Sequence, residues 1–206
     1  MAKEDHAMQI IESRTIPGTI LERSKMDGAD GMEFLDKVFF ITNGIMLTQI
    51  REITGIDGTT LQNWLKRGWV ASPEHKLYSK EHLARILLIN IMRDTLQLSQ
   101  ISGVLRYING EVDTTEDDII TESALYDYVC RVIAILADEN SAGLNAMGEA
   151  IRVVTAEYTE RFTGARARLE TGLNIIVSAY YGSLVKQYTD ALVENCCGKT
   201  LRRKRP

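Results

Sequence analysis

The stretch TGIDGTTLQNWLKRGW, residues 54–69, decides the fold of its part of the chain. Gly55 follows the apolar positions of LTQIREIT, and glycine suits the end of a helix because it adopts the left-handed conformation without a steric penalty. Asp57 is placed to cap a second helix, in which Leu61 and Trp64 are expected to be buried. The pattern predicts two short helices joined by a tight glycine turn, which is a helix-turn-helix.

The residues that follow extend this pattern. WVASPEHKLYSK, residues 69–80, holds two short β-prone pairs, Trp69-Val70 and Leu77-Tyr78, on either side of ASPEHK, and this predicts a small wing. Ser79 is placed to cap the next helix, KEHLARILLINIMRDT, which is apolar nearly all round and is therefore expected to be the central buried element. A further helix, LQLSQISGVLRYIN, ends before Gly110.

The period of the apolar residues is helical almost throughout and the chain has only three prolines, so we expect an all-α fold. Residues 1–30, with the turn-prone MDGADG, are expected to form a partly mobile arm, and MEFLDKVFFIT a first helix. Beyond the charged linker EVDTTEDD, three long amphipathic helices are predicted at about 116–138, 142–163 and 165–195, which would form a C-terminal bundle.

These patterns divide the chain into four parts. They are an arm with a first helix (1–45), a winged helix-turn-helix domain (46–110), a helical domain for dimerisation with a candidate effector site (111–198), and a basic tail (199–206). The net charge of −4 is unevenly spread: residues 46–110 carry eight Lys or Arg against five Asp or Glu, and residues 111–198 carry six against fifteen. A basic segment between acidic ones is compatible with a nucleic-acid-binding module.

Other features exclude several classes of protein. The 206 residues hold no apolar run as long as a membrane helix, and the charged N-terminus is unlike a secretion signal. Three cysteines, Cys130, Cys196 and Cys197, do not make a closed disulfide framework, so we expect a cytoplasmic protein without a membrane partner. We find no catalytic motif and expect no enzyme, no metal site and no cofactor; GKT at 198–200 lacks the first glycine of a phosphate-binding loop.

The order of helix, glycine turn, helix, wing, LYSKEHL and apolar helix resembles the MerR-type winged helix of bacterial transcription regulators. It is closer still to an uncharacterised bacterial family of MerR-like domains of unknown function, which pairs a YSKEH helix start with a long apolar helix. The resemblance covers about residues 45–110. It implies a dimeric DNA-binding module. Where MerR-type regulators commonly have Arg and Tyr, this chain has Gln62 and Asn63, and Lys76 replaces the wing arginine.

The expected DNA-binding residues lie mainly on the second helix. A helix that enters the major groove needs short polar groups near its N-terminus and cations at its edges. Gln62 and Asn63 can read base edges, whereas cations meet phosphates. The full set of candidates is Arg51, Thr59, Thr60, Gln62, Asn63, Lys66, Arg67 and Lys76.

We therefore expect a sequence-specific transcriptional regulator that binds double-stranded DNA as a homodimer. One alternative is a protein-interaction module on a winged helix that has lost its DNA contacts. Another is a sensor with a small-molecule effector in a pocket lined by Tyr126, Tyr128, Tyr158, Phe162, Tyr180 and Tyr181, although such aromatic residues more often form plain core.

Overall fold

The computed structural model of the chain describes residues 15–110, 112, 117–138 and 144–201. Within these residues the fold is all-helical, as predicted, and β pairing occurs only as isolated bridges. None of the described helices is both long and apolar enough to cross a membrane. The elements are η1 (Arg23–Met26), α2 (Gly31–Val38), α3 (Leu47–Thr54), α4 (Gly58–Lys66), α5 (Lys80–Met92), α6 (Leu98–Asn109), α7 (Glu122–Asp138), α8 (Leu144–Thr155) and α9 (Ala165–Leu201).

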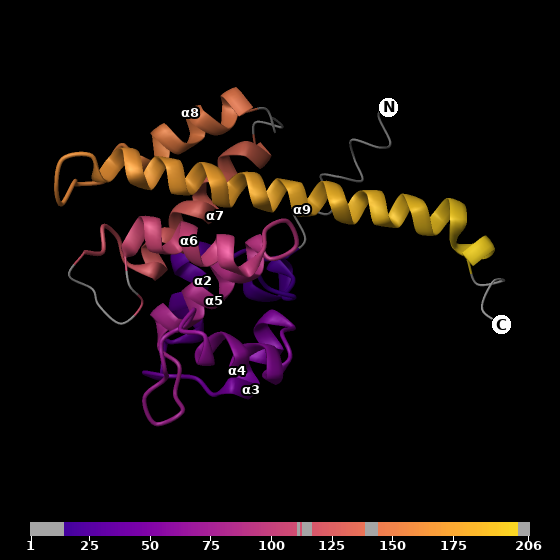
Figure 1. Cartoon of the computed structure of the whole chain (residues 1–206), viewed down its shortest axis with the longest axis horizontal. Helices are drawn as coiled ribbons and strands as arrows, with labels where there is room; N and C mark the ends of the chain where they lie inside the picture. Colours follow the sequence, from indigo (N-terminus) through magenta and orange to yellow (C-terminus); the bar gives the residue numbers. More distant parts are fainter. Residues whose placement is uncertain (1–14, 111, 113–116, 139–143, 202–206) are drawn as a thin grey trace.

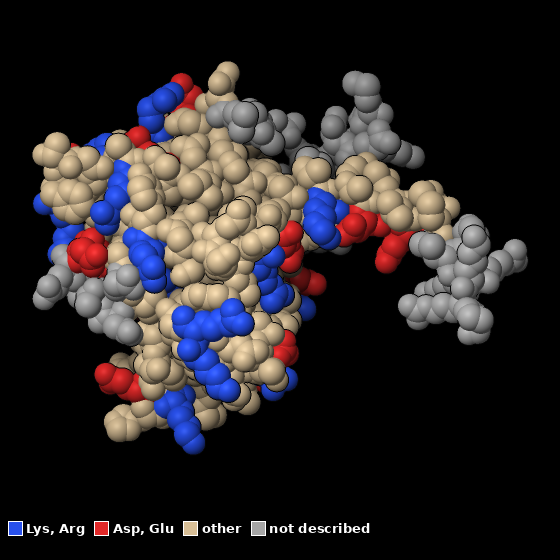
Figure 2. All heavy atoms as spheres, viewed as in Figure 1, with Lys and Arg blue, Asp and Glu red and all other residues tan. Residues whose placement is uncertain are grey.

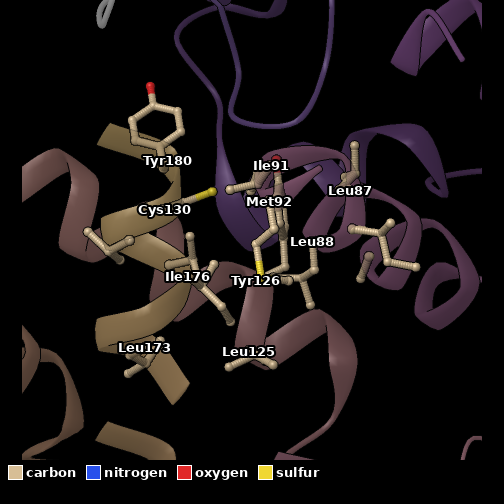
Figure 3. Packing of buried hydrophobic residues seen from close by; sticks show 14 of the residues in the cluster. Leu87, Leu88, Ile91, Met92, Leu125, Tyr126, Cys130, Leu173, Ile176 and Tyr180 are labelled. Carbon is tan, nitrogen blue, oxygen red and sulfur yellow. The ribbon is translucent and has the colours of Figure 1, made fainter. Parts of the chain in front are cut away.

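The helix α5 is the centre of the core, which confirms its prediction as the buried element. It contacts α3, α6, α7 and α9, and Figure 3 shows its apolar side chains meeting those of α7 and α9. Ser79 caps α5 as expected, since its hydroxyl accepts a hydrogen bond from the His82 amide at 3.4 Å.

The helix α7 joins the two ends of the molecule. It contacts α2 and α5 on one side and α8 and α9 on the other. In Figure 1, α3 and α4 lie at the opposite end of the molecule from α8, and α9 continues well past the other helices. One continuous apolar core therefore runs through the parts that the sequence divided at residue 110.

Residues 15–30 are packed against this core rather than forming the predicted arm; residues 1–14 lie outside the described residues. Ile16 is fully buried, the Tyr126 hydroxyl donates to the Pro17 carbonyl at 2.8 Å, and Asn90 of α5 donates to the Gly18 carbonyl at 2.8 Å. These partners come from α5 and α7, which explains why a local pattern of turn residues does not reveal them.

Some helix limits also differ from the prediction. The first helix stops at Val38 rather than near Thr42, and α8 ends at Thr155 rather than near 163. Arg166, in the first turn of α9, donates to the carbonyls of Thr155 and Tyr158. The Arg166 guanidinium thus donates hydrogen bonds to carbonyls that would accept from backbone amides if α8 were longer.

Candidate nucleic-acid interface

The turn between α3 and α4 has the geometry that its sequence predicts. Gly55 has a φ of 70° and its amide donates to the Arg51 carbonyl at 2.8 Å, which ends α3. A Cβ at Gly55 would also lie 2.8 Å from Ile20 Cγ2, so the position needs glycine for space as well as for conformation. Asp57 then caps α4 by accepting from the Thr60 amide at 2.9 Å.

The helix α4 has one buried face and one exposed face. Leu61 and Trp64 are buried, which confirms the prediction that Trp64 is a core residue. Thr59, Gln62, Asn63, Lys66 and Arg67 are exposed. Thr60 differs from the other candidates because its hydroxyl donates to Asp57 at 2.6 Å and belongs to the cap. This bond, with the one from the Thr60 amide, lowers the pKa of the Asp57 carboxyl.

Lys76 lies at the tip of a tight two-residue turn. The Leu77 amide donates to the Glu74 carbonyl at 2.8 Å, and the central residues His75 and Lys76 have φ values of 49° and 65°. Positive φ at both central positions is what a type I′ hairpin turn requires. The turn therefore places Lys76 at its tip, where the residue is exposed.

The hairpin pairs differently from the prediction. Leu77 bridges Glu74, and Tyr78 bridges Ile45 with hydrogen bonds of 2.8 and 2.9 Å in the two directions. The predicted partners of residues 77–78, Trp69 and Val70, form no bridge within the described residues. Val70 is instead buried in the core. Its β-branched side chain is therefore explained by packing in the core and not by strand pairing.

Four cations surround the exposed face of α4 and its neighbouring turns. Arg51, Lys66, Arg67 and Lys76 are exposed, and within the described residues none of them lies in salt-bridge distance of a carboxylate. The Arg67 guanidinium lies 5.2 Å from the centre of the Trp69 ring, a cation–π contact that holds its position. Figure 2 shows Lys and Arg side chains gathered over this end of the molecule.

Two acidic residues accompany these cations. Glu52 lines the same depression at the α3–α4 turn as Arg51, and Glu74 stands beside the hairpin tip that carries Lys76; both are exposed. The positive surface therefore has carboxylates at its margins, whereas the outer face of α4 itself carries none.

The charge count of the sequence overstates the free positive charge of residues 46–110. Arg85 is buried and forms an ion pair with Glu122 of α7. Lys80 pairs with Asp36 at 2.5 Å. Neither partner is close in sequence, so counting alone treats both cations as available.

The remaining candidates of the sequence lie elsewhere. Cys196 and Cys197 are exposed, with 3.3 Å between their sulfur atoms. Cys130 is buried in α7 (Figure 3), where burial raises the pKa of its thiol to about 12. Among the aromatic residues, Tyr126 and Tyr158 are buried and their hydroxyls donate to the carbonyls of Pro17 and Ile119. These two side chains are therefore part of the core.

Comparison with known proteins adds two likenesses. Residues 32–129 match the family described as "Domain of unknown function (DUF1836)", a segment that begins in α2 and ends inside α7 and so crosses residue 110. The chain is 24% identical over 125 residues to "Uncharacterized protein YkrK" of Bacillus subtilis (strain 168), which covers 58% of this chain and 53% of that protein. The match thus spans about half the length of this curated relative. No solved structure matches.

Proposed function

We propose that the chain is a sequence-specific DNA-binding transcriptional regulator that acts as a homodimer. In this proposal α3 and α4 form the helix-turn-helix of a MerR-like winged helix, and the hairpin at residues 74–77 is its wing. The observation that carries the proposal is the outer face of α4, whose polar side chains are exposed and whose cations are unpaired within the described residues. Such a face is what a helix in the major groove requires.

The exposed residues divide into two roles. Gln62 and Asn63 lie on α4 with short polar side chains that can pair with base edges, Asn and Gln being suited to adenine. Lys66, Arg67 and Lys76 lie at the edge of the helix and on the hairpin tip, where phosphates flank the groove. Arg51 lies next to Gly58 at the N-terminus of α4, where its exposed guanidinium can meet a further phosphate.

A titration against selected and scrambled duplexes at several salt concentrations tests the proposal. Lys66→Ala should weaken binding to every duplex and reduce the log-log salt slope by about 1. Asn63→Ala should cost about 1–3 kcal/mol on the selected duplex and leave the scrambled one unaffected. Arg152→Ala removes an exposed cation of α8, at the opposite end of the molecule from α4; it is the control and should change neither. Absence of salt-sensitive binding by the wild type would refute the proposal.

A protein-interaction module is the second candidate function, and one observation favours it. Phe40 and Ile41, just after α2, are 85% and 90% exposed. Adjacent large apolar side chains in solvent are typical of a surface that meets a partner. If the duplex titration fails, this candidate predicts that Phe40→Ser abolishes capture of a partner protein that Lys66→Ala leaves intact.

A further inference from the structure

Two free thiols lie side by side near the end of α9. Cys196 and Cys197 are both exposed, and their sulfur atoms are 3.3 Å apart. This end of α9 extends beyond the other helices (Figure 1), so a small molecule in solution can approach both sulfurs together. The Cys196 thiol donates to the Val193 carbonyl at 3.5 Å, and its side chain therefore leans toward the preceding turn, as side chains of a helix do. The pair is thus an accessible dithiol on a regular helix.

The separation of the two sulfurs indicates what they can bind. A disulfide requires sulfurs about 2.05 Å apart, which is well short of the distance between these two. Two bonds of about 2.3 Å, the length of a zinc–sulfur bond, hold sulfurs about 3.3 Å apart when they meet at about 90° and about 4.6 Å apart when they are in line. The observed separation therefore fits one atom that bridges both sulfurs with a bond angle close to a right angle.

The number of ligands narrows the class of that atom. A structural zinc site needs four ligands, and the part of the chain that the structure describes holds no group of three or more metal-ligating side chains. Trivalent arsenic is soft, prefers sulfur, and forms three bonds at angles close to a right angle. Two thiols therefore satisfy an arsenic atom whose third bond is to carbon. Val193, one turn before Cys197 and 45% exposed, offers apolar surface to that organic group.

We propose that Cys196 and Cys197 together bind trivalent arsenic compounds that carry one organic substituent. An arsenoxide, R–As=O, condenses with the two thiols: two As–S bonds form, the As=O bond breaks, and the oxygen leaves with both thiol hydrogens as water. Arsenic stays trivalent, so the step consumes no oxidant or reductant. The hydrogen bond with Cys196 raises the pKa of Cys197, which therefore enters the reaction as a thiol and supplies one of those hydrogens. The proposal does not depend on DNA binding.

Phenylarsine oxide is the probe for this site. One equivalent, mixed with the reduced full chain, should give a single adduct in intact-mass spectra, with a phenylarsenic group gained and two hydrogens lost. The adduct should persist in excess 2-mercaptoethanol, a monothiol. Because the second thiol of a pair reacts at a high effective concentration, Cys196→Ser and Cys197→Ser should each bind the arsenical at least about a hundredfold more weakly. Cys130, which is buried in α7, should remain unmodified.

A matched variant separates the number of thiols from their spacing. The double change Cys197→Ser, Thr189→Cys keeps two thiols at exposed positions of α9 but places them two turns, about 10 Å, apart along the helix. It should bind phenylarsine oxide as weakly as the single variants do.

Arsenous acid tests the organic substituent. Its third arsenic bond is to a hydroxyl group, which gains nothing from packing against Val193, so the wild type should bind it at least about tenfold more weakly than phenylarsine oxide. The proposal is overturned if 2-mercaptoethanol strips the arsenical from the wild type as readily as from the single variants, if the spaced pair of thiols binds as tightly as the native pair, or if arsenous acid binds equally well.

Discussion

His82 closes the first turn of α5, and its ring lies against the segment that holds Ala71 and Ser72. Its Nδ1 accepts from the Ser79 amide and lies 2.7 Å from the Ser79 hydroxyl. A doubly protonated ring could not accept from that amide. Burial lowers the pKa of His82, although the carbonyls of Ser72 and Ala71 and the carboxylates of Glu74 and Glu81 act in the opposite direction.

This lowered pKa predicts a loss of stability on acidification. The unfolded chain binds a proton at His82 as the pH falls through about 6.5, whereas the folded chain resists protonation until a lower pH, so the free energy of unfolding decreases over that interval. His82→Gln should flatten this pH dependence, because glutamine at the third helical position keeps the capping interaction with the amide of Ser79 but does not titrate. Urea unfolding of both proteins between about pH 7.5 and 5.0 measures the difference; parallel curves would contradict it.

The hairpin tip predicts a substitution that separates stability from binding. Lys76 has a φ of 65°, which is strained for a residue with a Cβ, so Lys76→Gly should raise the free energy of unfolding by about 0.5–1 kcal/mol. The same variant loses a proposed phosphate contact and should bind every duplex more weakly. Lys76→Ala is the control: it loses the charge but keeps the strain. Equal melting temperatures for the two variants would show that the turn is relaxed.

At the scale of elements, the joint between α5 and α7 depends on polar contacts, one of which is a buried ion pair. Arg85 forms an ion pair with Glu122 and donates to the Trp69 carbonyl at 2.6 Å. One turn earlier, both oxygens of Glu81 accept from Ser123, at 2.8 Å from its amide and 2.6 Å from its hydroxyl. Glu81 thus satisfies the N-terminus of α7 as well as standing in the first turn of its own helix.

Removing one member of the buried pair should cost far more than removing both. Arg85→Met leaves the Glu122 carboxylate buried without its cation, and we expect a loss of about 3–5 kcal/mol in the free energy of unfolding. The double variant Arg85→Met, Glu122→Met should recover most of that loss. Lys80→Met breaks the more exposed pair with Asp36 and should cost less than about 1 kcal/mol. Chemical denaturation of the four proteins completes the test, and similar losses for the single and double variants would contradict it.

The same contacts mark what the sequence can and cannot predict. The helices, the glycine turn, the caps at Asp57 and Ser79 and the burial of Trp64 follow from local spacing, and all of them are found in the structure. The partners of Arg85 and Arg166 do not follow from local spacing. Glu122 lies 37 residues from Arg85, and Arg166 of α9 donates to carbonyls at the end of α8. The spacing of apolar residues along the sequence does not predict such contacts between distant side chains. The exposed positions of the candidate interface were predictable, whereas the polar contacts between α5 and α7 were not, since they join residues far apart in the sequence.

For the whole molecule, α9 is the feature that supports a homodimer. Its second half lies away from the other helices in Figure 1, and it carries Val185, Leu192 and Val193, each between 45% and 49% exposed. An apolar stripe on a projecting helix is suited to pack against the same helix of a second copy, as an isologous interface requires.

We therefore expect a dimer in sedimentation experiments at micromolar concentration. Leu192→Asp with Val193→Asp should give a monomer with an unchanged melting profile of the core, because these side chains make no part of it. Ile41→Asp, at an apolar residue that is 90% exposed elsewhere, is the matched control and should remain dimeric. A wild type that sediments as a monomer would remove this part of the proposal.

The continuous course of α7 has a consequence for modularity. The family match ends at residue 129, in the middle of this helix, and the next turns carry the buried Val132, Ile133 and Leu136. A fragment cut at that residue would lose the covering that α9 gives to α5 and α6, and its half-helix would end with apolar positions facing water. In this chain the matched segment therefore depends on the outer half of α7 and on α9 to cover its apolar residues.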